Sequence, residues 1–313
     1  MRVLIEIVAP VFLVIALGYG AARWRFVDTA GFRGLNTFTF GLASPALLFL
    51  GGTTGQVGGG PAALAFFIGT ALLYAGVLLG ARFGARVPLG HAGMLALDST
   101  FGNTVMMGIP LITAAFGPQA LAVLLAILAL HSMVLLGTAT VVAEIALHAH
   151  APWRRVLRAT LLGVAKNPIV MAVAAALLWR LLGLPAPPGA VRRALELLGA
   201  AGPPVALFCL GGSLAGFDAR AGWRETALVS ALKLLVLPLL VWGAARLLAL
   251  PPLETAVAVV TAALPTGANA FLLAQRYRMA ADRSGATVLV STTLSVATLA
   301  VLLGWFGAGA AGR

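Results

Sequence analysis

Two long apolar runs in this sequence each contain a short polar interruption, DSTFGNTVMMGIPL at 98–111 and ALPTGANAF at 263–271. Side-chain amides and hydroxyls beside glycine and proline can bind a small polar solute through hydrogen bonds. A helix that breaks inside an apolar run also presents backbone donors where its second half begins, and these donors stabilise an anion. The interruptions therefore indicate non-covalent binding of an anion.

Asn103 is the strongest candidate ligand in the first interruption. At 1.5 Å per residue it lies roughly 18 Å into its apolar run, near the middle of a bilayer core about 30 Å thick. Its amide can donate two hydrogen bonds to a carboxylate; the alternative is that it caps the broken helix. Gly102 would allow close approach of the backbone, and Gly108 and Pro110 are predicted helix-breaking positions.

The second interruption places Pro265 at a similar depth in its own run. Proline lacks a backbone N–H, so it frees a carbonyl one turn upstream. Thr266, Gly267 and Asn269 follow it, and their polar groups could point into the same cavity. Backbone outside a helix is tolerated at this depth only where it is buried in protein or lines a cavity. We therefore expect the two interruptions to cross at one substrate site.

Asp98 and Lys233 are ionisable residues inside predicted membrane helices, and such residues are functional candidates by default. One interpretation makes Asp98 a proton carrier that couples transport to a gradient. A second makes Asp98 and Lys233 an ion pair that only supports the fold. A third lets Lys233 attract an anionic substrate.

The composition identifies a polytopic membrane protein, because 61% of the 313 residues are hydrophobic and only 10% are charged. The net charge of +12 comes from basic residues between the apolar runs, so no nucleic-acid partner is expected. No HExxH, Asp-rich or Ser–His arrangement supports an intramembrane enzyme, and no metal or cofactor is expected.

Ten apolar segments are predicted to span the membrane as helices: 3–22, 34–52, 61–82, 91–116, 118–147, 161–184, 191–216, 224–249, 253–275 and 284–306. If the N-terminus lies outside, most basic residues fall on the opposite side of the membrane. That side is then the cytoplasm, and both termini are extracytoplasmic.

The two halves of the chain repeat the same features in the same order. SPALLFLGG at 44–52 in the second segment matches PPVALFCLGG at 203–212 in the seventh, and Pro45 and Pro204 are predicted to bend these helices. Because each half holds five segments, the second half must enter the membrane from the opposite side, which is typical of inverted repeats. We predict a first repeat at 1–150, a cytoplasmic linker at 151–160 and a second repeat at 161–313.

The motifs GNTVMMGIPL, PVALFCLGGSL and LPTGANAFLLAQRY make the chain similar to the auxin efflux carrier family. The resemblance covers essentially the whole chain, although plant members have proline where Gly102 stands. It implies ten helices in two inverted repeats with crossed, broken fourth and ninth helices, as in bile-acid symporters and sodium/proton antiporters. It also implies elevator-type alternating access and a homodimer, and it places Asn103 and Pro265 beside the substrate carboxylate.

We therefore predict an all-α carrier in the lipid bilayer of the cell (inner) membrane that moves a small organic anion. Malate, malonate and auxin-like acids are the expected substrates, since bacterial members of the family are permeases for such carboxylates. The alternative is a sodium- or proton-coupled cation transporter of the same fold. That chemistry usually needs two close intramembrane carboxylates, and this chain offers one.

Overall fold

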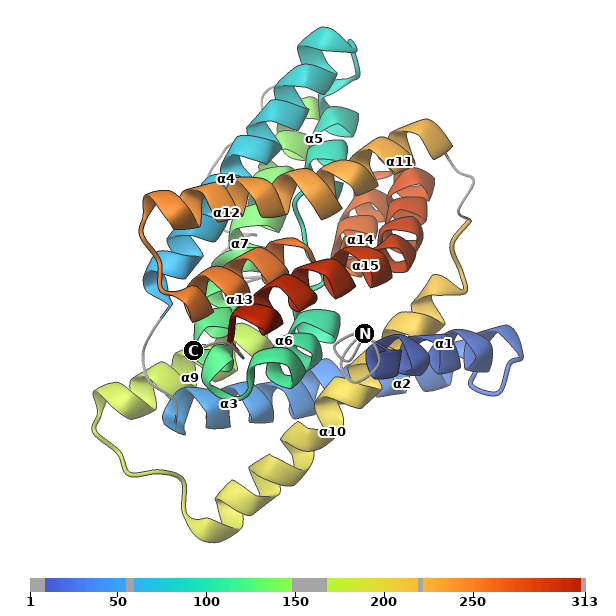
Figure 1. Cartoon of the computed structure of the whole chain (residues 1–313). Helices are drawn as coiled ribbons and strands as arrows, with labels where there is room; N and C mark the ends of the chain where they lie inside the picture. Colours follow the sequence, from blue (N-terminus) through green and yellow to red (C-terminus); the bar gives the residue numbers. More distant parts are fainter. Residues whose placement is uncertain (1–8, 55–58, 148–167, 219–221, 311–313) are drawn as a thin grey trace.

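A computed structural model describes residues 9–54, 59–147, 168–218 and 222–310, and the chain in these ranges is helical between short connections (Figure 1). Within them, the one isolated β-bridge is antiparallel and joins Gly102 to Thr266. The first residues of the segment predicted at 3–22 and the predicted linker at 151–160 lie outside the described residues. The prediction of an all-helical chain is confirmed for the part of the chain that is described.

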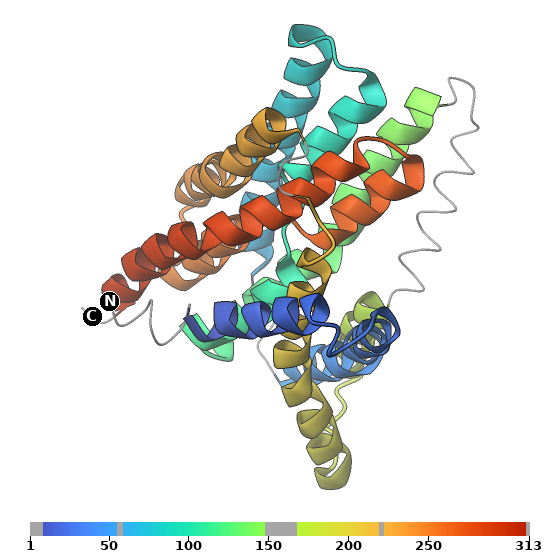
Figure 2. The same ribbon diagram turned by 90° about the vertical axis from the view of Figure 1, so that its right-hand side faces the viewer.

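The helices form two groups, which lie one above the other in both Figure 1 and Figure 2. The lower one, here called the α10 group, contains α1 (Ala9–Arg23), α2 (Thr29–Phe38), α3 (Ser44–Thr54), α9 (Pro168–Leu181) and α10 (Gly189–Leu214). The upper one, here called the crossing group, contains α4 (Gly60–Leu79), α5 (Leu89–Asp98), α6 (Ile109–Phe116), α7 (Gln119–Leu147), α11 (Trp223–Ala231), α12 (Leu237–Leu247), α13 (Pro252–Ala262), α14 (Ala268–Tyr277) and α15 (Ala281–Ala310).

The α10 group is held by very close contact between helix backbones. A Cβ atom added at Gly18 of α1 would lie 1.9 Å from the carbonyl oxygen of Phe208 on α10. One added at Gly211 of α10 would lie 1.8 Å from the carbonyl oxygen of Ile15 on α1. Helices in a membrane associate largely through such packing of small residues, since lipid supplies little hydrophobic driving force.

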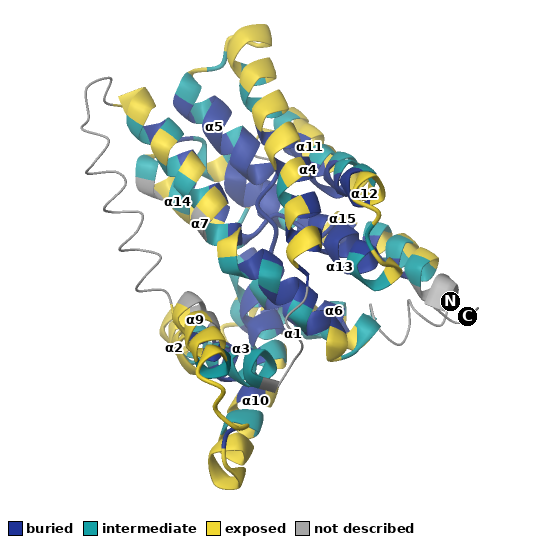
Figure 3. Ribbon diagram, turned by 90° about the vertical axis from the view of Figure 1, so that its left-hand side faces the viewer, coloured by how far each residue is buried: buried dark blue, intermediate teal, exposed yellow. Residues whose placement is uncertain are grey.

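In the part of the chain that is described, six helical segments are long and apolar enough to cross a membrane: Thr29–Thr53, Gly60–Gly84, Gln119–Leu147, Gly189–Leu214, Trp223–Leu247 and Ala281–Phe306. Exposed residues line the outer faces of the helices, whereas buried residues gather between them (Figure 3). Many of the exposed side chains are large and apolar, for example Leu64, Leu239 and Trp305, as expected of surfaces that face lipid. The chain is therefore a multi-pass membrane protein, and the number of ten spans stays a prediction.

Three prolines are each preceded by a wide, π-helical turn that ends two residues earlier. These turns are Thr39–Ala43, Thr104–Gly108 and Leu232–Val236, and they precede Pro45, Pro110 and Pro238. A proline ring clashes with the carbonyl one turn back and leaves it without a donor, and a widened turn relieves that clash. The chain then continues directly into α3, α6 and α12.

The predicted helix breaks at Gly108 and Pro110 are therefore wrong, and Pro45 and Pro204, where bends were predicted, do not break their helices either. Gly108 ends a π-helical turn, and Pro110 lies in the first turn of α6, where a missing N–H costs little. Pro45 lies in a continuous helical segment, and Pro204 lies inside the uninterrupted α10. The prolines disturb the local helix geometry, but the chain does not leave the helix at them.

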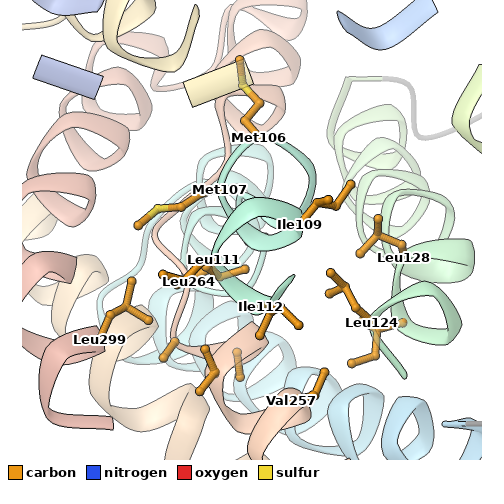
Figure 4. Packing of buried hydrophobic residues seen from close by; sticks show 14 of the residues in the cluster. Met106, Met107, Ile109, Leu111, Ile112, Leu124, Leu128, Val257, Leu264 and Leu299 are labelled. Carbon is orange, nitrogen blue, oxygen red and sulfur yellow. The ribbon is translucent and has the colours of Figure 1, made fainter. Parts of the chain in front are cut away.

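An apolar core surrounds α6 and the turn that precedes it (Figure 4). Its side chains come from this segment and from α7, α13, the turn after α13, and α15; they are Met106, Met107, Ile109, Leu111, Ile112, Leu124, Leu128, Val257, Leu264 and Leu299. Close packing of this kind leaves the segment after residue 103 little freedom to shift. The core therefore fixes one side of the place where the first interruption lies.

Candidate functional site

The first interruption begins at the end of α5, where two hydroxyl side chains donate hydrogen bonds to backbone carbonyls of the helix. That helix ends at Asp98. The hydroxyl groups of Ser99 and Thr100 donate to the carbonyls of Leu95 and Ala96 at 2.8 and 2.7 Å. Serine and threonine that bond back in this way weaken the helical pattern, and the glycine that follows makes an extended conformation inexpensive.

The second interruption follows α13, and its extended segment pairs with the first. The backbone N–H of Asn103 donates to the carbonyl of Pro265 at 2.8 Å. The backbone N–H of Gly267 donates to the carbonyl of Phe101 at 3.0 Å. Together with the bridge between Gly102 and Thr266, these bonds form a short antiparallel ladder. The two interruptions thus cross, and the carbonyl of Pro265 is used by the protein itself.

Thr266 ties the crossing to two further elements. Its hydroxyl donates to the backbone carbonyl of Asp98 at the end of α5, at 2.8 Å. Its backbone N–H donates to the hydroxyl of Ser291 on α15 at 3.0 Å. Thr266 is fully buried. A buried polar group without a partner would be costly, so these bonds fix the position of the second interruption.

Asp98 and Lys233 are both buried at the crossing, but these two described residues do not form the predicted ion pair. The carboxylate of Asp98 accepts a hydrogen bond from the hydroxyl of Ser284 on α15 at 2.7 Å. The ammonium of Lys233 donates to the carbonyl of Ala262, the last residue of α13, at 2.5 Å. The two charges point to different helix ends, and a sequence cannot reveal which carbonyl or hydroxyl a side chain will reach.

His131 of α7 belongs to the crossing and was missed by the sequence reasoning. Its Nε2 atom accepts the backbone N–H of Gly102 at 3.3 Å, and its ring lies 4.5 Å from that of Phe101 between the ring centroids. The side chain is 1% exposed. Accepting at Nε2 places the ring proton on Nδ1. An ionisable residue inside the apolar run at 118–147 is the signal that could have found it.

The amide of Asn103 is the open donor of the site. Asn103 is 6% exposed, and its Nδ2 atom has no hydrogen-bond partner among the described residues. An amide nitrogen buried without a partner costs free energy that a ligand can recover. The cap interpretation of Asn103 receives no support, because its side chain makes no hydrogen bond to the helix that follows.

The structure separates the other predicted site residues by their surroundings. Gly267 and Gly102 lie in the ladder itself, where their backbones are in close contact. Asn269, in the first turn of α14, is exposed and lies outside the buried part of the crossing. Pro45 and Pro204 lie in the α10 group and not at the crossing. Among the residues described, no three His, Cys, Asp or Glu side chains are grouped to hold a metal ion.

Comparisons with known proteins agree with a role in transport. The family model described as "Membrane transport protein" matches residues 3–303. A relative from Rhizobium meliloti (strain 1021), whose name reads "Putative malonate transporter", is 30% identical over 309 residues. The aligned region covers 95% of this chain and 94% of the relative.

Proposed function

This chain belongs to the auxin efflux carrier family of membrane transport proteins, and we propose that it carries a small carboxylate such as malonate or malate across the cell membrane. Family membership makes the chain a membrane transporter and not an enzyme. The carboxylate is proposed from the name of the relative and from the chemistry of the crossing. Both termini are proposed to be extracytoplasmic, and a homodimer is proposed as the assembly.

The unpartnered amide of Asn103 is the observation that carries this proposal. It is a buried donor at the place where two helices break. A carboxylate oxygen would satisfy it, and a hydrogen bond to a charged group contributes about 1.5–3 kcal/mol. An amide discriminates poorly between carboxylates, so the walls around it would decide which anion fits.

We also propose that the chain is a ten-helix inverted repeat. Counting helical segments along the chain makes α1 the first, α2–α3 the second, α9 the sixth and α10 the seventh. α1 packs on α10, and α9 packs on α3. An inverted repeat pairs the first segment with the sixth and the second with the seventh. It therefore converts the contact of α1 with α10 into the contact of α9 with α3. It also maps the crossing of the fourth and ninth segments onto itself.

Alternating access is proposed to occur by movement of the crossing group against the α10 group. Hydrogen bonds join the two interruptions to α5, α7 and α15, and another joins the turn before α12 to the end of α13. They join members of the crossing group to each other, so this group would move as one body with its bound anion. The tight backbone contact of α1 with α10 supports a stationary partner. The coupling role predicted for Asp98 stays a proposal.

The test is uptake of radiolabelled malonate by proteoliposomes that contain Asn103→Ala. We expect the initial rate at low malonate to fall roughly tenfold or more, because one hydrogen bond to a charged ligand is lost. The melting temperature without ligand should stay near that of the wild type, because the amide nitrogen has no partner among the residues described.

Asn269→Ala is the matched control, because it removes the same amide from the exposed first turn of α14. We expect it to keep most of the transport rate. Equal rates for the wild type and Asn103→Ala would remove Asn103 from the site. A wild type that takes up and binds neither malonate nor malate would contradict the proposed substrate class.

A further inference from the structure

The carbonyl end of α13 points at the ammonium of Lys233. The last carbonyls of a helix have no partner within the helix and carry a partial negative charge. Lys233 is 0% exposed, and its Nζ atom donates to the carbonyl of Ala262 at 2.5 Å. In transporters with interrupted helices, such carbonyl ends are where a coupling cation is coordinated. Here an atom of the protein itself occupies that position.

Lys233 has no counter-ion of its own in the part of the chain that is described. Asp98, a buried carboxylate at the same crossing, is engaged with Ser284 instead. His131, which faces the same segment from α7, accepts a hydrogen bond at Nε2. A buried charge without a partner is costly, so an anion bound nearby would stabilise the charged form of Lys233.

The ammonium lies close to the segment that carries Asn103. A Cβ atom added at Gly102 would be 3.6 Å from Nζ of Lys233 and 3.6 Å from Cγ2 of Thr104. The backbone turns tightly at Asn103, with φ −78° and ψ 61°, and the N–H of Thr104 donates to the carbonyl of Gly102 at 2.9 Å. The positive charge of Lys233 therefore lies beside the backbone turn that carries the Asn103 amide.

We propose that Lys233 is a built-in cation of the crossing, which takes the place of a soluble coupling cation such as Na⁺ and holds the anion by its charge. This inference rests on the proposed function, since it concerns the same site and the same carboxylate. If Lys233 has this role, transport by this chain needs no sodium ion. Lys233 acts by its charge beside the backbone turn at 102–104 and is a positioning residue, not one that touches the anion.

The first test uses the wild-type protein and needs no variant. Malonate uptake into proteoliposomes is measured with sodium chloride and with choline chloride at equal ionic strength and pH. The stabilisation of purified protein by malonate is measured in the same two salts. We expect rates and shifts that agree within about twofold, because the site already holds its cation. Uptake or stabilisation that requires sodium would overturn the proposal.

The second test is Lys233→Gln, which keeps a donor for the carbonyl of Ala262 but removes the charge. We expect malonate affinity to fall about thirtyfold or more, as when one partner of a buried charge pair is removed. Ser230→Ala is the control. Ser230 is a fully buried residue on the same helical segment, and its hydroxyl has no partner among the described residues. It should bind malonate like the wild type.

The outcomes separate the two proposals. Wild-type affinity in Lys233→Gln would show that only the hydrogen bond matters, and the built-in cation would be rejected. If Lys233→Gln does not fold, the comparison of sodium with choline in the wild type still decides. A wild type that transports malonate and depends on Asn103 but also needs sodium would reject the role of Lys233 and leave the proposed function intact.

Discussion

The two interrupted helices meet through one backbone ladder, yet they use their polar groups differently. In the second interruption, the N–H and hydroxyl of Thr266 and the N–H of Gly267 all have partners in the protein. In the first, the backbone of Asn103 is paired, but its amide Nδ2 has no partner among the described residues. The difference indicates that two similar helix breaks have different roles. The second holds the geometry of the crossing, and the first keeps a donor free.

Changes in the second interruption should therefore reduce stability, whereas a change at the Asn103 amide should reduce transport alone. Gly267→Ala is the largest expected effect on stability. The added Cβ would lie 2.9 Å from the Phe101 ring and 3.0 Å from the carbonyl oxygen of Gly102, which is backbone and cannot move aside as a flexible side chain would. We expect a cost of about 3 kcal/mol, seen as a lower melting temperature of the purified protein.

Gly102→Ala is the matched change in the first interruption. Its Cβ would have neighbours at ordinary distances of 3.5 and 3.6 Å, so we expect a much smaller loss of stability. Equal losses in the two variants would break the comparison, because both interruptions would then be equally constrained.

His131→Leu tests whether the first interruption also needs support from outside the ladder. The substitution leaves the N–H of Gly102 without its acceptor in a buried place, which costs about 2 kcal/mol. Hydrogen exchange of the peptide at 99–103 should become faster, and the melting temperature should fall. His131→Gln, which supplies an acceptor oxygen, should recover part of both. Unchanged exchange in His131→Leu would mean that this bond does not hold the segment.

Thr266→Val is the smallest expected effect and isolates the bond between the two broken helices. The hydroxyl donates from the second interruption to the carbonyl of Asp98 in the first, and its loss should cost about 1 kcal/mol. Thr100→Val is the control, because the Thr100 hydroxyl bonds only within its own helical turn. Thermal unfolding should rank Thr266→Val below Thr100→Val in stability. The reverse order would argue that the helices are joined by the backbone ladder alone.

The position of each interruption within its apolar run was enough to predict that both helices are interrupted near the middle of the membrane and that the two interruptions meet. Helix-breaking residues in an apolar run can be counted along the chain, and the rise of a helix converts the count into a position across the membrane. The same counting could not tell a break from a kink. Pro265 follows the end of a helix, but Pro110 begins one, because the π-helical turn before it accommodates the ring.

The partners of the charged residues could not be predicted in this way. Both Asp98 and Lys233 are ionisable residues inside predicted membrane helices, and an ion pair between them was one of the interpretations. In the fold, Asp98 faces Ser284 and Lys233 faces the carbonyl end of α13. The direction in which a side chain leaves its helix depends on how that helix is rotated against its neighbours, and neighbour packing sets this rotation.

The sequence by itself determined the environment, the helical class and the position of both interruptions, since these follow from local composition and from the fixed rise of a helix. Only the tertiary structure decided which polar groups are satisfied. It brought His131 to the backbone of Gly102, paired the carbonyl of Pro265, and left the Asn103 amide nitrogen without a partner among the residues described. Hydrogen bonds act over about 3 Å, so whether a donor has a partner is decided by packing between segments far apart in the chain.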